Sequence, residues 1–210
     1  MTKNQPQSAN EHDWLDSFVL SVWKPVVASL GIGIPIAYIF YTKVIGKRYP
    51  TVNHIPPELF DKKAFICGKV TSIGDADGFR LYHTGTGWSF LRRVPALRKD
   101  LKNQTIPIRI AGVDAPEGNH FNMKQQPFYV ESKTFLASLI LNRYVKVQLL
   151  SRDQYSRVVG MVYFRKPPFF IRRNVSEEML KQGFASIYVA KGAEYGDQLN
   201  RFEKAEKKAK

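Results

Sequence analysis

The sequence predicts an α+β protein, in which a five-stranded β-barrel with about three helices follows a single transmembrane helix. Three observations lead to this prediction: β-rich segments separated by turns between 64 and 164, helical spacing in 128–142 and beyond 174, and an uncharged apolar run at 25–42. We expect an N-terminal tail at 1–22, the transmembrane helix at 23–42, a linker at 43–62 and a folded domain at 63–210.

The apolar run reads PVVASLGIGIPIAYIFYT, eighteen positions without a charge. A bilayer core of about 30 Å needs roughly 20 helical residues, and Trp23 and Tyr41 lie where interfacial aromatic residues are common. The alternative is a buried core helix, but the run is apolar on every face and precedes the Pro-containing linker. Basic residues follow the run and acidic ones precede it, so the positive-inside rule predicts that 43–210 lies on the cytosol-like side of the membrane.

The body of the chain contains five predicted strands. The first two, 64–73 and 79–84, flank the turn GDADG and form a hairpin, and the third begins at Ile106. Between them, 85–105 is a basic, Gly-containing excursion whose role the sequence does not indicate. The last two strands, 144–150 and 157–164, flank the turn SRDQYS.

Three helices complete the body. In 128–142, five apolar residues recur at helical spacing on one side: Phe128, Phe135, Leu136, Leu139 and Ile140. A second helix, capped by Asn174 or Ser176, runs to Gln182 before Gly183, and a third is expected near 195–210. A small closed barrel suits this order of elements because closure removes exposed strand edges, and the five-stranded oligonucleotide-binding (OB) fold is the best-known example.

The composition restricts the class of protein. The 210 residues contain 32 Lys plus Arg against 18 Asp plus Glu, a net charge of +14. Residues 1–22 carry −2, so the remainder carries +14 − (−2) = +16. Such a field attracts polyanions such as nucleic acid or anionic membrane, although basic proteins also use charge for solubility alone. Because Cys67 is the sole cysteine, a disulfide scaffold and a Cys-rich metal site are excluded.

Three stretches at strand ends or turns carry the candidate chemistry: DADG at 75–78, RIAGVDAPE at 109–117 and DQYSR at 153–157. Their carboxylates suit calcium or magnesium rather than zinc. The first stretch does not start an EF-hand, because the twelfth residue counted from Asp75 is Thr86 and that from Asp77 is Trp88. Taken alone, DADG is most simply a hairpin turn.

Strand alternation places Arg109 on the same face as Ala111 and Val113. A guanidinium on an apolar barrel face is costly without an anionic partner. That partner is either Asp114 or Glu117, in an internal salt bridge, or a bound phosphate.

Together these motifs resemble the thermonuclease-like family typified by staphylococcal nuclease, over about residues 63–210. The family signature is an aspartate-rich hairpin turn, then Arg followed after five residues by Asp and three later by Glu, then Tyr-x-Arg in a later turn. All three parts occur here in order. The excursion at 85–105 and the N-terminal run are also similar to those of the fungal membrane-bound mitochondrial members.

The resemblance implies a role for each matched position. Asp77, Asp114 and the main-chain carbonyl of Ala115 would bind Ca²⁺, with Asp75 assisting through water. The catalytic residues would be Arg109, Glu117 and Arg157, and the substrate-binding ones Tyr155 and, less closely matched, Tyr188. The sequence departs from the family at two positions. The family often has Thr where Ala115 stands, and the bacterial enzyme has a lysine where Gln154 stands.

The expected function is that of a membrane-anchored, calcium-dependent endonuclease that hydrolyses phosphodiester bonds in DNA and RNA with little sequence specificity. The resemblance implies release of the 5′-oxygen, 3′-phosphate ends and a mitochondrial location. One alternative is a catalytically inactive OB-barrel, tethered to a membrane, that binds nucleic acid or protein. Another is a membrane adaptor whose basic face binds anionic lipid.

Overall fold

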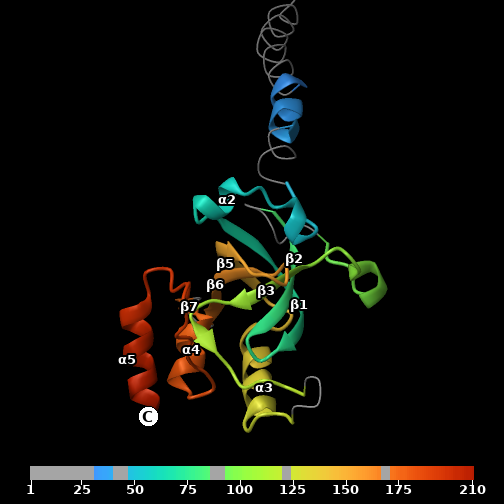
Figure 1. Ribbon diagram of the computed structural model, residues 1–210. Helices are drawn as coiled ribbons and strands as arrows, with labels where there is room; N and C mark the ends of the chain where they lie inside the picture. The colour runs from blue at the N-terminus through green and yellow to red at the C-terminus, as the bar shows by residue number, and fades with distance from the viewer. Residues whose placement is uncertain (1–30, 40–46, 86–92, 120–123, 167–170) are drawn as a thin grey trace, which may run out of the picture. The chain divides into compact units, whose positions relative to one another are not determined.

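The computed structural model describes residues 31–39, 47–85, 93–119, 124–166 and 171–210 (Figure 1). The chain divides into two units, Met1–Ile45 and Gly46–Lys210. In the first unit, residues 31–39 are helical and exposed. The predicted tail at 1–22 and the rest of the predicted transmembrane helix at 23–42 lie outside the described residues. Within the described ranges, no helix combines the length and the apolar character needed to span a bilayer.

The second unit is built on a six-stranded, mostly antiparallel sheet in the order β3-β2-β1-β5-β6-β7. The strands are β1 (Phe65–Asp75), β2 (Gly78–His83), β3 (Ile106–Ile110), β5 (Tyr144–Arg152), β6 (Val158–Lys166) and β7 (Ile171–Asn174). A parallel pairing of β3 with β6 joins the first and fifth strands of this order. The five predicted strands therefore close into a ring, to which β7 is added along β6.

Alternating side chains fill the ring. In β3, Ile106, Ile108 and Ile110 are fully buried, and the same alternation recurs in β5 with Val145, Val147 and Leu149. A strand directs successive side chains to opposite faces, so each of these strands sends one face to the core and the other outward. Arg109 is therefore on the outer face, between two core isoleucines.

The prediction that Arg109 shares an apolar barrel face with Ala111 and Val113 is wrong, because Arg109 alternates with the buried residues Ile108 and Ile110. Strand β3 ends at Ile110, and Gly112 has a φ of 77°, so the alternation does not continue to Ala111 and Val113. A short strand β4 (Val113–Asp114) then pairs with β8 (Ser186–Ile187). The turn at Gly112 thus redirects the chain from the barrel wall toward Asp114.

The longer helices are α3 (Tyr129–Ile140), α4 (Val175–Lys181) and α5 (Leu199–Ala209). Helices α3 and α4 pack against the barrel, and α5 packs against α4 and β8 on the outside (Figure 1). The predicted Asn174 cap is present, since its side chain accepts a hydrogen bond from the Glu177 backbone N–H at 3.4 Å. In α3, Leu136 and Ile140 are buried as predicted. Phe128 is not part of that face: it precedes the helix with a φ of 64° and is 69% exposed.

Residues 47–62, which the sequence assigns to a linker, pack against the barrel. They contain the 3-10 helix η2 (Val52–His54) and the short helix α2 (Glu58–Asp61), and both Val52 and Ile55 are buried. The backbone N–H of Tyr49 donates to Nδ1 of His83 at 2.8 Å. The basic excursion contains one further element in its described part, the 3-10 helix η4 (Arg98–Leu101).

Candidate active site

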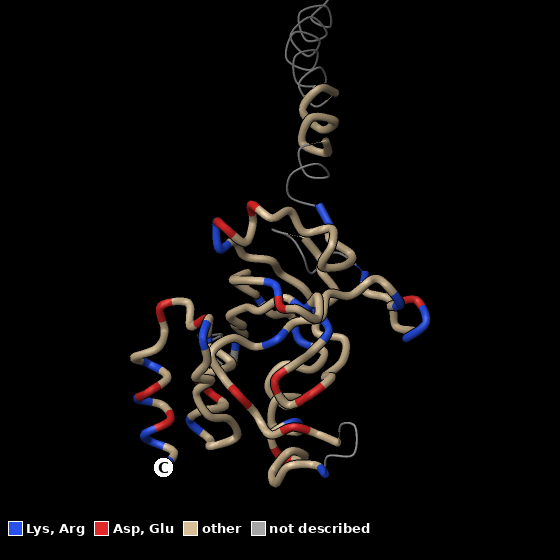
Figure 2. Tube along the Cα trace, viewed as in Figure 1, with Lys and Arg blue, Asp and Glu red and all other residues tan. Residues whose placement is uncertain are grey.

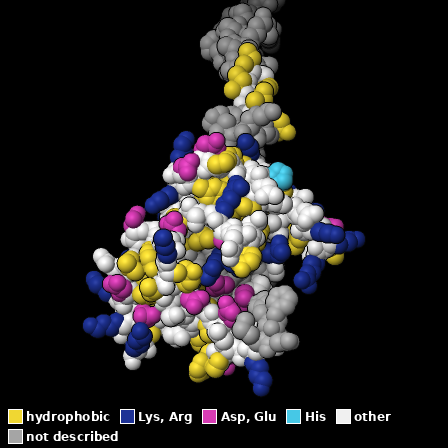
Figure 3. All heavy atoms as spheres, in the orientation of Figure 1, with side chains coloured by type: hydrophobic (Ala, Val, Ile, Leu, Met, Phe, Trp, Pro, Cys, Tyr) yellow, Lys and Arg dark blue, Asp and Glu magenta, His cyan; other side chains and the backbone are white. Residues whose placement is uncertain are grey.

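One cleft of about 600 Å³ collects the three motifs, which are separated along the chain. It is lined by Asp75, Asp77, Arg109, Asp114, Ala115, Glu117, Gln154, Tyr155 and Arg157. Figure 2 shows acidic positions of the β1–β2 turn and of the segment after β3 in one region of the barrel, and Figure 3 shows carboxylates clustered on that face. All the predicted metal-binding and catalytic residues line this cleft, and so does Tyr155.

The β1–β2 turn positions the first two carboxylates. Its two connecting residues are Ala76, which is fully buried, and Asp77. The Asp75 carboxylate accepts a hydrogen bond from the Ala76 backbone N–H at 2.9 Å, a local turn bond typical of aspartate. The Asp77 carbonyl accepts another from the Ile110 backbone N–H at 2.9 Å, which fixes the turn to the end of β3. One hydrogen bond within the turn and one to the end of β3 therefore hold the turn in place.

Asp77 and Arg109 form an ion pair, with Oδ2 of the aspartate 3.2 Å from Nε of the arginine. Burial raises the pKa of Asp77 above its ordinary value; the Arg109 and Arg157 charges oppose this shift, and those of Asp75 and Asp114 add to it. The net direction is upward, because the charges of the two arginines do not fully offset the cost of burying the ionised Asp77 carboxylate. A bound cation would relieve that cost.

Asp114 and Ala115 follow the turn at Gly112. Ser176 on α4 donates its hydroxyl hydrogen to the Ala111 carbonyl at 2.8 Å, and Tyr188 donates its backbone N–H to the Gly112 carbonyl at 3.3 Å. These bonds hold the segment against α4 and the chain that follows β8. Asp114 is exposed and the Ala115 residue is buried, so the segment presents a carboxylate to the cleft from a fixed backbone.

Glu117 is held through its main chain rather than its carboxylate. Its backbone N–H donates to Oε1 of Gln126 at 3.0 Å, and its carbonyl accepts from the Gln126 N–H at 3.0 Å. The side chain is exposed at the cleft. This arrangement fixes the backbone and leaves the carboxylate accessible in the cleft.

Asp153, which begins the DQYSR stretch but has no predicted role of its own, holds Arg157. Oδ2 of Asp153 lies 2.6 Å from Nε of Arg157, and Oδ1 accepts the Arg157 and Tyr155 backbone N–H groups at 2.8 and 2.9 Å. The signal was present in the sequence, as an Asp that begins the turn four residues before the Arg.

The two predicted substrate tyrosines differ in position. Tyr155 lines the cleft, is 70% exposed, and has its ring centre 5.3 Å from the Arg157 guanidinium. Tyr188 does not line the cleft. It lies in a neighbouring hollow, with its ring centre 5.0 Å from the Arg109 guanidinium. Tyr155 therefore presents an exposed ring at the cleft, whereas the Tyr188 ring packs beside an arginine of the cleft.

The donor set is compatible with a hard cation. Asp77, Asp114 and the Ala115 carbonyl supply oxygen, the ligand that calcium and magnesium prefer. Among the described residues, no three Asp, Glu, His or Cys side chains come close enough together to form a ready metal site. Two carboxylates and a main-chain oxygen that line one cleft are donors of the kind that these cations accept when water completes the coordination shell.

The fold and the cleft define a chain of the staphylococcal nuclease class. The model of the staphylococcal nuclease homologue family matches residues 107–210, and the chain belongs to this family. The chain is 50% identical over 184 residues to a Podospora anserina protein named probable endonuclease LCL3, covering 85% of this chain and 65% of that protein. A Pyricularia oryzae protein of the same name is 44% identical over 209 residues, covering 97% and 79% of the two chains. An Aspergillus niger relative is 41% identical over 209 residues, covering 94% and 75%.

Proposed function

We propose that this chain is a calcium-dependent endonuclease that hydrolyses phosphodiester bonds in DNA and RNA with little base preference. The observation that carries the proposal is the meeting of two arginines and four carboxylates in one cleft. The names of the relatives, probable endonucleases, support the same reaction class.

Arg109 and Arg157 are suited to bind the scissile phosphate. A guanidinium presents a planar set of N–H donors that matches phosphate oxygens, and negative charge on those oxygens increases in the transition state. Each arginine has a carboxylate partner, Asp77 and Asp153 respectively. Asp153 pre-orients Arg157 for the phosphate, and the ion pair with Asp77 orients Arg109.

Glu117 is the residue we assign as general base. Its main chain is fixed by Gln126 and its carboxylate is exposed in the cleft. It accepts a proton from the attacking water, whose oxygen bonds to phosphorus while the bond between phosphorus and the 5′-oxygen breaks; the 5′-oxygen takes a proton from solvent water and leaves as a hydroxyl, and the phosphate remains on the 3′ side.

Asp77, Asp114 and the Ala115 carbonyl are the ligands we assign to calcium, with Asp75 assisting through water. Bound calcium would act as a Lewis acid that neutralises part of the phosphate charge. All of these residues line the cleft together with Arg109 and Arg157, which supports this assignment.

We further propose that residues 23–42 anchor the enzyme in a membrane, mitochondrial by the family resemblance, with the catalytic unit on the cytosol-like side. The support is the uncharged run at 25–42 and its flanking charges. Alkaline carbonate extraction of membranes tests the anchor. Retention of the full chain in the membrane pellet, and its loss after deletion of 1–42, is the expected result.

The nuclease proposal is tested with the purified full chain, supercoiled plasmid, single-stranded DNA and RNA, with calcium or with a chelator. We expect nicking and degradation only with calcium, and loss of activity in Glu117→Gln and Arg157→Ala. A folded wild-type chain that binds nucleic acid but cuts none of the three substrates with calcium would establish the inactive OB-barrel instead.

A further inference from the structure

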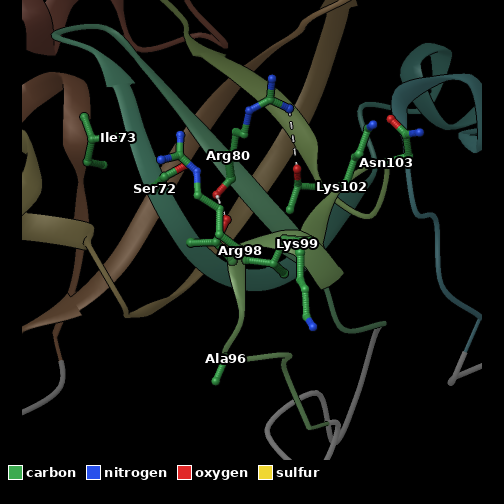
Figure 4. Close-up of a pocket in the computed structure, with 11 residues that line it drawn as sticks. Ser72, Ile73, Arg80, Ala96, Arg98, Lys99, Lys102 and Asn103 are labelled. Atoms are coloured by element: carbon green, nitrogen blue, oxygen red, sulfur yellow. Dashed lines mark hydrogen bonds between the residues drawn. The ribbon is translucent and has the colours of Figure 1, made fainter.

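A second hollow lies beside the cleft, on the outside of the β1–β2 hairpin. This basic groove has a volume of about 880 Å³ and is formed by residues of β1 and β2 together with the segment 96–105. It is lined by Thr71, Ser72, Ile73, Arg80, Ala96, Arg98, Lys99, Leu101, Lys102, Asn103 and Thr105. Figure 4 shows Arg80 on the hairpin and three further cations on and beside η4 around it. The described part of the basic excursion therefore forms one wall of the groove.

The lining of this groove is cationic. Arg80, Arg98, Lys99 and Lys102 line it, all four are exposed, and the lining contains no carboxylate. Among the ion pairs that the structure describes, none involves these four residues. The Arg80 side chain donates a hydrogen bond to the Thr105 hydroxyl at 3.5 Å. The hydroxyl group of Ser72 and the amide group of Asn103 accompany the cations and can donate hydrogen bonds to phosphate oxygens.

Strand register places the groove next to the cleft on one face of the barrel. Asp75 pairs with Gly78, and Gly78 pairs with Arg109, so these three residues form one row across β1, β2 and β3. Ser72, Arg80 and Pro107 pair in the same way and form another row. Directly paired residues of antiparallel strands project from the same face, as do residues two apart along a strand. The cleft row and the groove row therefore share the outer face.

The two rows are close enough for one bound nucleic-acid strand to reach both. Two residues of a β-strand span roughly 7 Å, and one nucleic-acid strand of a DNA duplex advances about 3.4 Å per nucleotide. Arg80 is also the diagonal neighbour of Arg109, a relation that separates Cα atoms by about 7–8 Å. A phosphate held by Arg109 thus lies within about two nucleotides of one held by Arg80.

We infer that the basic groove is an accessory nucleic-acid site, which binds the phosphodiester backbone of the substrate strand on one side of the scissile bond. This inference deepens the proposed function and assigns a role to the basic excursion. A nucleic-acid strand is favoured over an anionic membrane because the cations line a hollow that adjoins the cleft on one face, and a strand can continue from one to the other. The contacts are to phosphates, so the site adds affinity and reach without base preference.

The test is binding of a single-stranded oligonucleotide by the full chain carrying Glu117→Gln, with a chelator, over a series of salt concentrations. The groove variant carries Arg98→Gln, Lys99→Gln and Lys102→Gln. Its matched control carries Lys204→Gln, Lys207→Gln and Lys208→Gln, which removes three exposed charges from α5. We expect a roughly tenfold weaker Kd for the groove variant, with a salt slope smaller by about 0.7 per lost phosphate contact, and little change for the control.

A second variant distinguishes the loss of positive charge from a structural effect of replacing these side chains. It carries Arg98→Lys, Lys99→Arg and Lys102→Arg. It should retain the wild-type salt slope, because it retains the charges. An unchanged Kd and slope in the Gln variant, or equal losses in the groove variant and the α5 control, would overturn the inference.

Binding to lipid vesicles tests the alternative that the basic groove binds anionic membrane. The groove variant and wild type are compared on phosphatidylcholine vesicles with and without phosphatidylserine. Loss of the phosphatidylserine-dependent binding with oligonucleotide affinity intact would assign the groove to lipid and overturn the inference. The oligonucleotide assay needs no cleavage, so a chain that binds through the groove but never hydrolyses would refute the proposed function alone.

Discussion

The carboxylate of Asp153 binds Arg157 twice, by a 2.6 Å ion pair to Nε and a 2.8 Å hydrogen bond from the backbone N–H of the same residue. One aspartate therefore fixes both the turn and the direction of the guanidinium. Burial would raise the pKa of Asp153, but the bonds from Arg157 and the Tyr155 N–H outweigh that effect and hold it below its ordinary value. The arginine is thus oriented before a phosphate arrives.

Asp153→Asn should lower kcat roughly 10- to 100-fold with a smaller effect on KM, because a misplaced guanidinium loses its transition-state contact. Asp153→Glu should recover part of the loss. Steady-state kinetics on single-stranded DNA measures both. The control is Glu178→Gln, which breaks the ion pair with Arg173, a residue that does not line the cleft. Equal kcat in Asp153→Asn and wild type would remove Asp153 from the positioning of Arg157.

The same substitution has a pH signature. A carboxylate whose folded pKa is depressed stabilises the fold above its unfolded pKa of about 3.9, and that stability is lost as the pH falls through the folded pKa. The difference in unfolding free energy between wild type and Asp153→Asn should therefore be constant near neutrality and shrink below about pH 4. Urea unfolding at several pH values measures it. A difference that grows toward acid pH would contradict the depressed pKa.

Asp77→Asn should abolish calcium-dependent activity without destabilising the metal-free protein. The folded pKa of Asp77 is raised, so its ionisation lowers stability as the pH rises from about 3.9 through the folded pKa. With a chelator at neutral pH, the Asn variant should melt no lower than wild type. Calcium should raise the melting temperature of wild type and leave that of the variant unchanged. A calcium-induced shift of equal size in both proteins would remove Asp77 from the metal site.

Tyr155→Ala should weaken binding of single-stranded substrate by about 1–3 kcal/mol, since an exposed aromatic ring in a basic cleft stacks on a base of any type. Tyr155→Phe should bind as wild type does, because stacking needs the ring and not the hydroxyl. Fluorescence anisotropy with oligonucleotides of different base composition measures the effect. Loss confined to one base would contradict sequence-tolerant stacking.

Gly112→Ala should destabilise the catalytic unit by about 1–3 kcal/mol. Gly112 has a φ of 77°, and a Cβ there would lie 2.6 Å from a ring carbon of Phe202, a fully buried residue of α5. Urea unfolding measures the loss. Gly192→Ala is the matched control, because Gly192 has a φ of 85° with open space around it and reports the backbone strain alone. Equal losses in the two variants would show that the contact with Phe202 contributes nothing.

Much of the secondary structure was predictable because its causes are local. Alternating β-branched residues predict the strands, the DADG turn predicts the hairpin, and Asn174 predicts the start of α4. Phe128 was wrongly assigned to the buried side of α3 because periodicity does not reveal that the helix begins one residue later. Residues 47–62 were assigned to a linker because the burial of Val52 and Ile55 depends on contacts with a barrel distant in sequence.

The sequence by itself determined which chemical groups this protein carries: the excess of positive charge, the carboxylates suited to a hard cation and the two arginines. It also predicted five of the eight strands that the structure describes, and missed β4, β7 and β8. Only the tertiary structure decided how they meet. The parallel pairing of β3 with β6 sets Arg109 opposite Val159, two residues from Arg157, and no local pattern encodes a pairing between such distant segments. The same register decided that Arg109 faces outward, in line with Arg80 and the basic groove, because the face on which a side chain lies depends on where its strand ends and which neighbours it meets.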